Sequence, residues 1–475
     1  MVFKIFSMAK NITATIKMYQ VGELGDCFLL HFTDGTDQSN VLIDCGSFRN
    51  KQVSKDRLNA IVTHIKSLLG DKKLDVVVGT HQHNDHLSGF VHCETLFTGM
   101  IDQVWLSWLD NPNDGLARQI GKDQKALVSQ LQAIHSKLSS IAPLKQALKN
   151  GIVQDVLGFY AADGNNDPVI PAKGIENLRK LGEKDAAYLS PGQQLDLPGL
   201  PAGSVKVYVL GPPRDQALLF DKDPKKGESY DPKLAIAGLN ATRLLSALDN
   251  YDADTKNRDE EQFPFNKSFQ LSKSDAESEI LKIYNDRKNG WRKIDLEWLD
   301  QAARLALYLD SYTNNSSLVL AFELVKSKKV LLFAADAQTG NWLSWKDIKW
   351  EHAGTGFTSY SLLQNTVLYK VGHHGSHNAT LVEGLEKMEH EELVAMISVD
   401  KTDPNITKEN GWKMPAANLY KRLKEKTQFR VLRMDDAYAD GCDPVKNKGK
   451  SRWDKLPVKP VVDRKNGFIE YTVKG

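Results

Sequence analysis

The sequence predicts a mixed α/β (α+β) fold in which two strand-rich halves flank a polar, helical middle. Three observations lead to this prediction. Short runs of strand length, apolar or alternating with polar residues, recur in residues 13–110 and again in 313–473. A charge-dense stretch with little strand character lies between the two halves. A connection of that length is more plausible as an inserted subdomain than as a loop.

Strand and helix signals alternate through the first half of the chain. Residues 13–20 alternate apolar and polar side chains, as a half-buried strand does. Two further apolar runs, at 27–32 and 41–44, are separated by a turn-like polar segment. Apolar side chains at helical spacing predict a helix over 53–69, and a short β-branched run at 74–79 then predicts a buried strand.

The rest of the chain contains isolated helices and a second group of strands. The pattern predicts helices over 127–141, 294–309 and 416–426, and strands over 205–210, 317–324, 329–333, 367–371, 393–399, 429–433 and 468–473. These predictions divide the chain into a core and two insertions. The divisions are a first half of the core at 1–112, a mostly helical and loop insertion at 113–203, a core strand at 204–213, a helical insertion at 214–312, and a second half of the core at 313–475 with a basic loop at 437–466.

Charge is nearly balanced over the whole chain, with 62 Lys and Arg against 60 Asp and Glu and a net charge of +2. This balance excludes a basic footprint for nucleic acid that covers the whole chain. Residues 421–475 differ, because they contain 15 basic and 8 acidic side chains. The candidate nucleic-acid contacts are Lys446, Lys448, Lys450 and Arg452, and a solvated surface loop is the alternative.

Targeting features are not visible in the sequence. No stretch approaches 18 consecutive apolar residues, so a membrane-spanning helix is not expected. The first residues lack the apolar core of a signal peptide. The four cysteines form no CxxC pair and are too few for a disulfide framework. These features predict a cytoplasmic protein without a membrane partner.

The strongest chemical signal follows the predicted strand at 74–79. His81, His83, Asp85 and His86 fall within six residues at the point where that strand ends. A tight turn there can direct neighbouring side chains to opposite sides, so the first two histidines can share one metal while Asp85 and His86 turn to a second. Imidazole nitrogen and carboxylate oxygen suit Zn²⁺, Mn²⁺ or Fe²⁺. The segment therefore predicts one or two divalent metals, Zn or Mn, with Fe as a further option.

This Thr-His-x-His-x-Asp-His segment resembles the metal-binding motif of the metallo-β-lactamase superfamily. Further segments, in the family's order, narrow the resemblance to the ComEC-like branch, which includes the hydrolase-like domain of the ComEC competence proteins and its soluble relatives. They are VGELGDC at 21–27, LIDCG at 42–46, NNSSLV at 314–319, VLLFAADA at 330–337 and KVGHHGS at 370–376. The resemblance implies an αββα sandwich, with two sheets face to face and helices outside. It does not cover the middle insertion.

The resemblance also implies a role for each matching residue. The implied metal ligands are His81, His83, Asp85, His86, Asp336 and one of His373 and His374. The first two histidines would bind one metal and Asp85 with His86 the other, while Asp336 would bridge both. Asp44 would orient ligands from behind, and Ser376 would lie near the site.

Three positions depart from the family pattern. Ala335 replaces the glycine before Asp336, Met414 stands where the branch often has a histidine before proline, and the Gly-Pro-Pro at 211–213 offers no histidine. Methionine is not among the usual protein ligands of zinc. One metal can therefore lack a protein ligand, with water or His377 in its place, and the sequence leaves open whether one site or both are filled.

A metal lowers the pKa of its bound water to about 7, which makes hydroxide available at neutral pH. The resemblance then implies a metal-dependent hydrolase, most simply a phosphodiesterase or nuclease that acts on nucleic acid in DNA processing or phage defence. Asp85, Asp336 and His377 are the candidate catalytic residues. The alternatives are a small-molecule phosphodiesterase, or a subunit with weak or no catalysis that docks a protein partner through its insertions.

Overall fold

The computed structural model describes residues 11–22, 24–49, 51–140, 152–160, 170–219, 282–283, 286, 288, 297–350, 356–400, 403, 406, 412–435 and 453–475. The chain divides into two compact units. One, here called the core unit, comprises Met1–Lys122, Gly158–Lys233 and Asp310–Gly475, and the other comprises Asp123–Leu157 and Leu234–Leu309. Every site residue discussed below belongs to the core unit.

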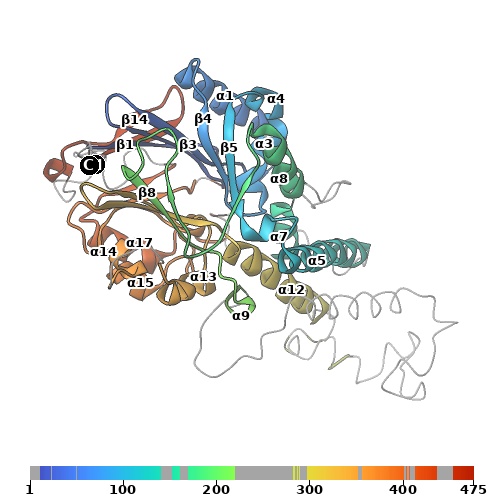
Figure 1. Ribbon diagram of the computed structural model, residues 1–475. Coiled ribbons are helices and arrows are strands. Elements are labelled where there is room, and N and C mark those ends of the chain that lie inside the picture. The colour runs from blue at the N-terminus through green and yellow to red at the C-terminus, as the bar shows by residue number, and fades with distance from the viewer. Residues whose placement is uncertain are drawn as a thin grey trace. The chain divides into compact units, whose positions relative to one another are not determined.

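An eight-stranded sheet forms the first layer of the core unit, in the order β14-β15-β1-β2-β3-β4-β5-β6 (Figure 1). Its strands are β1 (Thr13–Tyr19), β2 (Cys27–Thr33), β3 (Gln38–Cys45), β4 (Leu74–Gly79), β5 (Ile101–Ser107), β6 (Ala187–Leu189), β14 (Val461–Asp463) and β15 (Phe468–Lys474). Neighbours from β14 to β3 pair antiparallel, and neighbours from β3 to β6 pair parallel.

A seven-stranded sheet forms the second layer, in the order β13-β12-β11-β10-β9-β8-β7. Its strands are β7 (Gln194–Asp196), β8 (Val205–Gly211), β9 (Val319–Leu324), β10 (Lys329–Phe333), β11 (Thr366–Lys370), β12 (Val394–Ile397) and β13 (Val431–Arg433). Strands β7 to β10 pair antiparallel, whereas β10 to β13 pair parallel. The carboxyl ends of these four parallel strands therefore meet at one edge of the sheet.

Aromatic side chains join the two sheets in a single core. Phe28 of β2 lies edge-on to Phe333 of β10, with ring centroids 5.7 Å apart, and Phe32 stacks on Phe322 of β9 at 5.6 Å. Strand β4 is an almost continuous apolar run because both of its faces are covered. The mixed α/β class that the sequence predicts is confirmed.

Helices cover the outer side of each sheet in the core unit (Figure 1). Those on the first sheet are α1 (Gln52–Leu69), α3 (Gly89–His92), α4 (Glu94–Phe97) and α8 (Ile170–Leu181), and those on the second are α13 (Thr339–Ser344), α14 (Ser359–Gln364), α15 (Val382–Glu386) and α17 (Ala417–Lys426). The remaining described helices are α2 (Asn84–Leu87), α5 (Gly115–Ser140), α7 (Ile152–Phe159), α9 (Gln216–Leu219), α12 (Glu297–Asn315) and the short η1 (Trp108–Asp110), η8 (Trp345–Asp347), η9 (His373–Gly375) and η10 (Trp453–Lys455). None of these helices combines the length and apolar character needed to cross a bilayer.

The segment 113–203, predicted as a mostly helical and loop insertion, also contributes to the sheets. Strands β6 and β7 extend the first and second sheet respectively, and α8 packs against α2 and α3. Strands of three residues are too short to produce a periodic signal in the sequence. Most of the predicted helical insertion at 214–312 lies outside the described residues, as do Lys446, Lys448, Lys450 and Arg452 of the basic loop.

Candidate metal centre

The predicted ligands gather where strands of the two sheets end. His81 and His83 follow β4 in a tight turn, and Asp85 and His86 lie on the short helix α2 that continues it. Asp336 follows β10 and His374 follows β11. Because β10 and β11 are parallel neighbours, they carry these last two side chains to the same edge.

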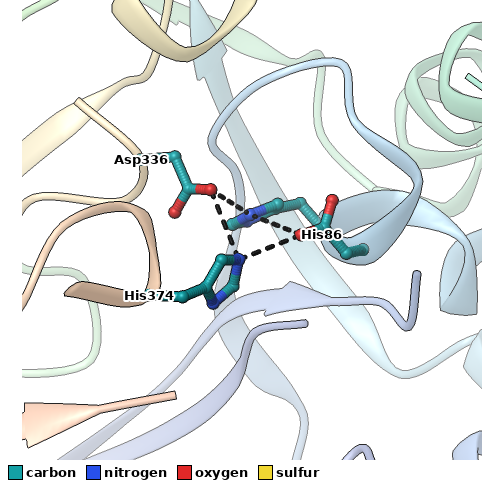
Figure 2. Close-up of side chains that lie close together, drawn as sticks. His86, Asp336 and His374 are labelled. Carbon is teal, nitrogen blue, oxygen red and sulfur yellow. Dashed lines mark hydrogen bonds and ion pairs between the residues drawn. The ribbon is translucent and has the colours of Figure 1, made fainter. Parts of the chain in front are cut away.

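Four buried side chains converge into one group, which we call the four-donor group: Asp85, His86, Asp336 and His374. Figure 2 shows three of them, His86, Asp336 and His374, turned toward one another. Asp336 Oδ2 lies 3.2 Å from His86 Nε2 and 3.4 Å from His374 Nε2. Asp85 Oδ2 lies 3.7 Å from His86 Nε2 and 3.0 Å from His374 Nε2. Two nitrogens and two oxygens thus enclose one point.

These four nitrogen–oxygen separations are compatible with a divalent cation at the centre of the group. Ligand atoms about 2.0–2.1 Å from a zinc ion stand roughly 3.3–3.4 Å apart at the corners of a tetrahedron. The observed range of 3.0–3.7 Å brackets that value. In addition, Asp85 Oδ1 and His86 Nε2 are buried and make no hydrogen bond within the described ranges. The residues present therefore fit a divalent metal.

Hydrogen bonds on the far side of each imidazole fix its orientation. His86 Nδ1 lies 2.7 Å from Asp44 Oδ2, and Asp44 also accepts hydrogen bonds from the amide and hydroxyl of Thr80. His374 Nδ1 donates to the backbone carbonyl of Ser398 at 2.6 Å. In both rings a protonated Nδ1 leaves Nε2 as the atom that can bind a cation. Asp44 thus lies behind His86, on the side of the ring away from Nε2.

A buried lysine completes the surroundings of the group. Lys370 Nζ contacts Asp26 Oδ2, lies 3.4 Å from Asp336 Oδ1 and donates to the carbonyl of Ala335 at 2.9 Å. Ser398 Oγ donates to the other oxygen of Asp26. Lys370 therefore holds one Asp336 oxygen and leaves Oδ2 facing the imidazoles. Sequence reasoning missed Asp26 and Lys370, although both lie inside family-like segments that it used.

The charged side chains of the group strongly shift one another's pKa values. Burial raises the pKa of the Asp336 carboxyl, but the cationic side chains beside it, led by His86 and His374, outweigh burial and hold that pKa well below its ordinary value. Burial lowers the pKa of His86, yet the carboxylates around it, led by Asp336 and Asp85, hold it well above its ordinary value. The carboxylates therefore stay ionised, which suits them to a cation.

His81 and His83 form a separate imidazole pair beside the four-donor group. Their Nε2 and Nδ1 atoms lie 3.1 Å apart, and the His81 ring stands 4.1 Å from that of His86, centroid to centroid. Burial lowers the pKa of His83 to about 3 and that of His81 well below its ordinary value, so both are neutral, the form that binds metals. Within the described ranges, no further His, Cys, Asp or Glu joins this pair in a group able to hold a metal.

The structure also places the remaining predicted residues. His374 enters the four-donor group, whereas His373 Nδ1 lies 3.1 Å from the Gln338 amide nitrogen. Both histidines have positive φ, 37° and 50°, and their Nδ1 atoms have different partners, Gln338 for His373 and Ser398 for His374. Ser376 Oγ donates to Asn378 at 2.9 Å. His377 is exposed, and no hydrogen bond or ion pair found among the described residues links it to the group.

The arrangement can hold one divalent cation in the four-donor group and offers two neutral imidazoles beside it. The predicted first pair and second pair of ligands thus occupy different surroundings. Comparison with models of known families and with curated proteins gives no match for this chain.

Proposed function

We propose that this chain is a metal-dependent hydrolase of the metallo-β-lactamase type, related to the ComEC-like branch, and that it cleaves phosphodiester bonds in nucleic acid. The observation that carries the proposal is the convergence of Asp85, His86, Asp336 and His374, with nitrogen–oxygen separations of 3.0–3.7 Å. The order of the family-like segments and the two face-to-face sheets support it.

Asp85 Oδ2, His86 Nε2, Asp336 Oδ2 and His374 Nε2 would hold the metal. When bound, a divalent cation makes water acidic enough to supply hydroxide near neutral pH and draws charge from a leaving oxygen. Lys370 keeps Asp336 Oδ2 turned toward the group by holding Oδ1. Asp85 Oδ1, which has no hydrogen-bond partner within the described ranges, can accept a hydrogen bond from the attacking water and orient it.

The substrate class rests on the ComEC-like resemblance and on the basic character of residues 421–475. A phosphodiester brings a negative charge to the site, which a divalent cation and nearby basic side chains neutralise. We therefore place nucleic acid ahead of a small phosphodiester. The docking of a protein partner without catalysis is the remaining alternative, and the experiment below separates all three.

The test incubates the protein with single-stranded DNA, double-stranded DNA, RNA and bis-p-nitrophenyl phosphate, each with Mn²⁺ or Zn²⁺. Asp336→Ala should abolish metal-dependent cleavage, and Asp102→Ala should leave it intact, since Asp102 is a surface residue of β5 paired with Lys184. Cleavage of the small ester alone would reject nucleic acid as the substrate. An absence of turnover with every substrate would reject the hydrolase and favour partner docking.

A further inference from the structure

A cavity of about 410 Å³ lies on the core unit outside the four-donor group. We call it the β13 cleft. Helix α1, the turn between β14 and β15, and the segments that follow β1, β12 and β13 form its walls, and the residues that matter below are Gly22, Arg57, Asp400, Asp435, Arg464 and Lys465. A cavity of this size accommodates a group as large as a nucleotide.

The β13 cleft is lined in part by residues at the sheet edge that carries His374. Strands β11, β12 and β13 are parallel neighbours, so their carboxyl ends meet at that edge. Ser398 follows β12 and accepts the hydrogen bond of His374, and Asp400, two residues further on, lines the cleft. Asp435 lines it two residues after the end of β13. The cleft and the four-donor group are thus neighbours along one edge.

The charge of the cleft favours an anion. Arg57, Arg464 and Lys465 line it together with Asp400 and Asp435. Asp435 is already held by Arg433, whose Nε lies 2.8 Å from Asp435 Oδ1. The lining therefore carries three cations against two carboxylates, a net charge of +1.

Gly22 leaves the space that the guanidinium of Arg57 occupies. Gly22 has φ of 74°, and a Cβ atom there would lie 1.6 Å from Arg57 Nη1. The guanidinium of Arg57 therefore rests directly on the Gly22 backbone, a position that any side chain at residue 22 would deny it. Arg464 and Lys465 come from the β14–β15 turn, so two segments distant in sequence supply the positive charge of the lining.

We propose that the β13 cleft binds a phosphate group of the nucleic-acid chain, through Arg57, Arg464 and Lys465, while a neighbouring phosphodiester occupies the metal centre. Guanidinium groups match phosphate oxygens in charge and geometry, and lysine adds a point charge. This inference rests on the proposed function for the identity of the ligand. It also gives a role to Arg464 and Lys465, which belong to the part of the predicted basic loop (437–466) that the structure describes.

The test measures binding rather than turnover, so that it can fail separately from the proposed function. A fluorescent phosphorothioate oligonucleotide, which keeps its charges and resists cleavage, is titrated with the metal-loaded protein at several salt concentrations. The variant is Arg57→Gln/Arg464→Gln/Lys465→Gln, and the matched control is Lys66→Gln on α1, a lysine outside the cleft. Thermal unfolding of each protein checks that it is folded.

We expect the triple variant to bind on the order of tenfold or more weakly, because it loses three charge-assisted contacts. Its affinity should also depend less on salt, with a slope reduced by about 0.7 for each contact removed. Lys66→Gln should bind within twofold of the wild type. Binding of the folded triple variant within twofold of the wild type, at an unchanged salt slope, would overturn the inference even if the metal centre cleaves nucleic acid.

Two further arms identify the source of the phosphate. A 5′-mononucleotide and inorganic phosphate compete with the labelled oligonucleotide on the wild type and on the triple variant. If the substitutions weaken the oligonucleotide alone, the cleft binds a phosphate within a chain, as proposed. If they weaken the mononucleotide equally, the cleft binds free phosphate esters as well, and the phosphate-binding assignment stands on either result.

Discussion

The two halves of the predicted metal centre differ in what surrounds them. The four-donor group draws ligands from both sheets, and Asp44, Ser398 and Lys370 hold its side chains from behind. The imidazole pair, His81 and His83, lies on one turn. Eight non-glycine residues in the described ranges have positive φ, and four of them lie in or beside the four-donor group: Asp44, Ala335, His373 and His374. Neither member of the imidazole pair has positive φ. Strained backbone persists where surrounding contacts fix it, so one half is built more tightly than the other.

This contrast predicts unequal metal binding. Asp336→Ala should lose the metal of the four-donor group and reduce cleavage on the order of 10³-fold or more. The substitution removes Oδ2, the ligand atom that lies close to the Nε2 atoms of both His86 and His374. His83→Ala should keep that metal, since His83 lies outside the group. Elemental analysis of the purified proteins measures the difference. Equal loss of metal in both variants would remove the distinction between the halves.

A smaller effect is expected from the residues behind the ligands. Asp44→Asn keeps the size of the side chain but removes the charge that faces His86, so metal affinity should fall about 10–100-fold. Gln82→Ala, on the turn of the imidazole pair, should change the affinity of the four-donor group less than threefold. Competition with a chromogenic chelator gives both values. A larger effect from Gln82 than from Asp44 would contradict the comparison.

Asp110 probes the surroundings of the imidazole pair, because it accepts a hydrogen bond at 2.7 Å from Gln82, the residue between His81 and His83. Burial raises the pKa of Asp110 to about 6, above its unfolded value of 3.8. The folded state therefore binds the proton more tightly, and the wild type loses stability as pH rises from about 4 to 6. Asp110→Asn has no carboxyl to ionise, so it should be more stable than the wild type by about 3 kcal/mol at pH 7.

Chemical denaturation at pH 4 and at pH 7 tests this prediction. The advantage of Asp110→Asn should be present at pH 7 and largely absent at pH 4, since the wild-type carboxyl is mostly protonated in the folded state there. The asparagine retains an oxygen that can accept the Gln82 hydrogen bond. A stability difference that does not vary with pH would show that Asp110 is ionised in the fold at no extra cost.

The smallest predicted effect concerns backbone strain in the four-donor half. Ala335 has φ of 47°, and its carbonyl accepts hydrogen bonds from Lys370 Nζ and the His373 amide. Ala335→Gly should relieve the strain and stabilise the fold by about 1 kcal/mol or less, after the greater chain entropy of glycine is counted. The control is Ala337→Gly, a buried alanine without positive φ, which should destabilise. Thermal unfolding that shows equal losses in both variants would contradict this account.

Features encoded by local sequence were the ones that could be predicted. The run at 74–79 matches β4 because its apolar residues are contiguous, and the ligands at 81–86 are neighbours on one turn. The family-like segments at 330–337 and 370–376 added the two remaining donors of the group. The bridging role of Asp336 and the catalytic role of His377 stay predictions.

Other features depend on contacts that the sequence does not display. Adjacent histidines, His373 and His374, both have positive φ, yet only His374 joins the four-donor group, which the sequence alone does not show. Lys370 and Asp26 meet across the fold, so neither indicates the other in a linear reading. The structure also explains one departure from the family-like pattern, the alanine at position 335 in place of glycine. Ala335 has a left-handed backbone conformation, which glycine adopts without strain.

The pairing of β1 with β15 has a consequence for synthesis on the ribosome. Thr13–Tyr19 align with Phe468–Lys474. The edge of β1 that pairs with β15 therefore stays uncovered while roughly 450 further residues are translated. At about 5–20 residues per second, the wait is on the order of half a minute or more. An open strand edge invites pairing between nascent chains, and a lysine on it discourages that pairing. Lys17 lies on β1 at this edge, and in the complete fold it forms an ion pair with Glu470 of β15. The same side chain therefore discourages pairing between nascent chains first and stabilises the β1–β15 pair afterwards.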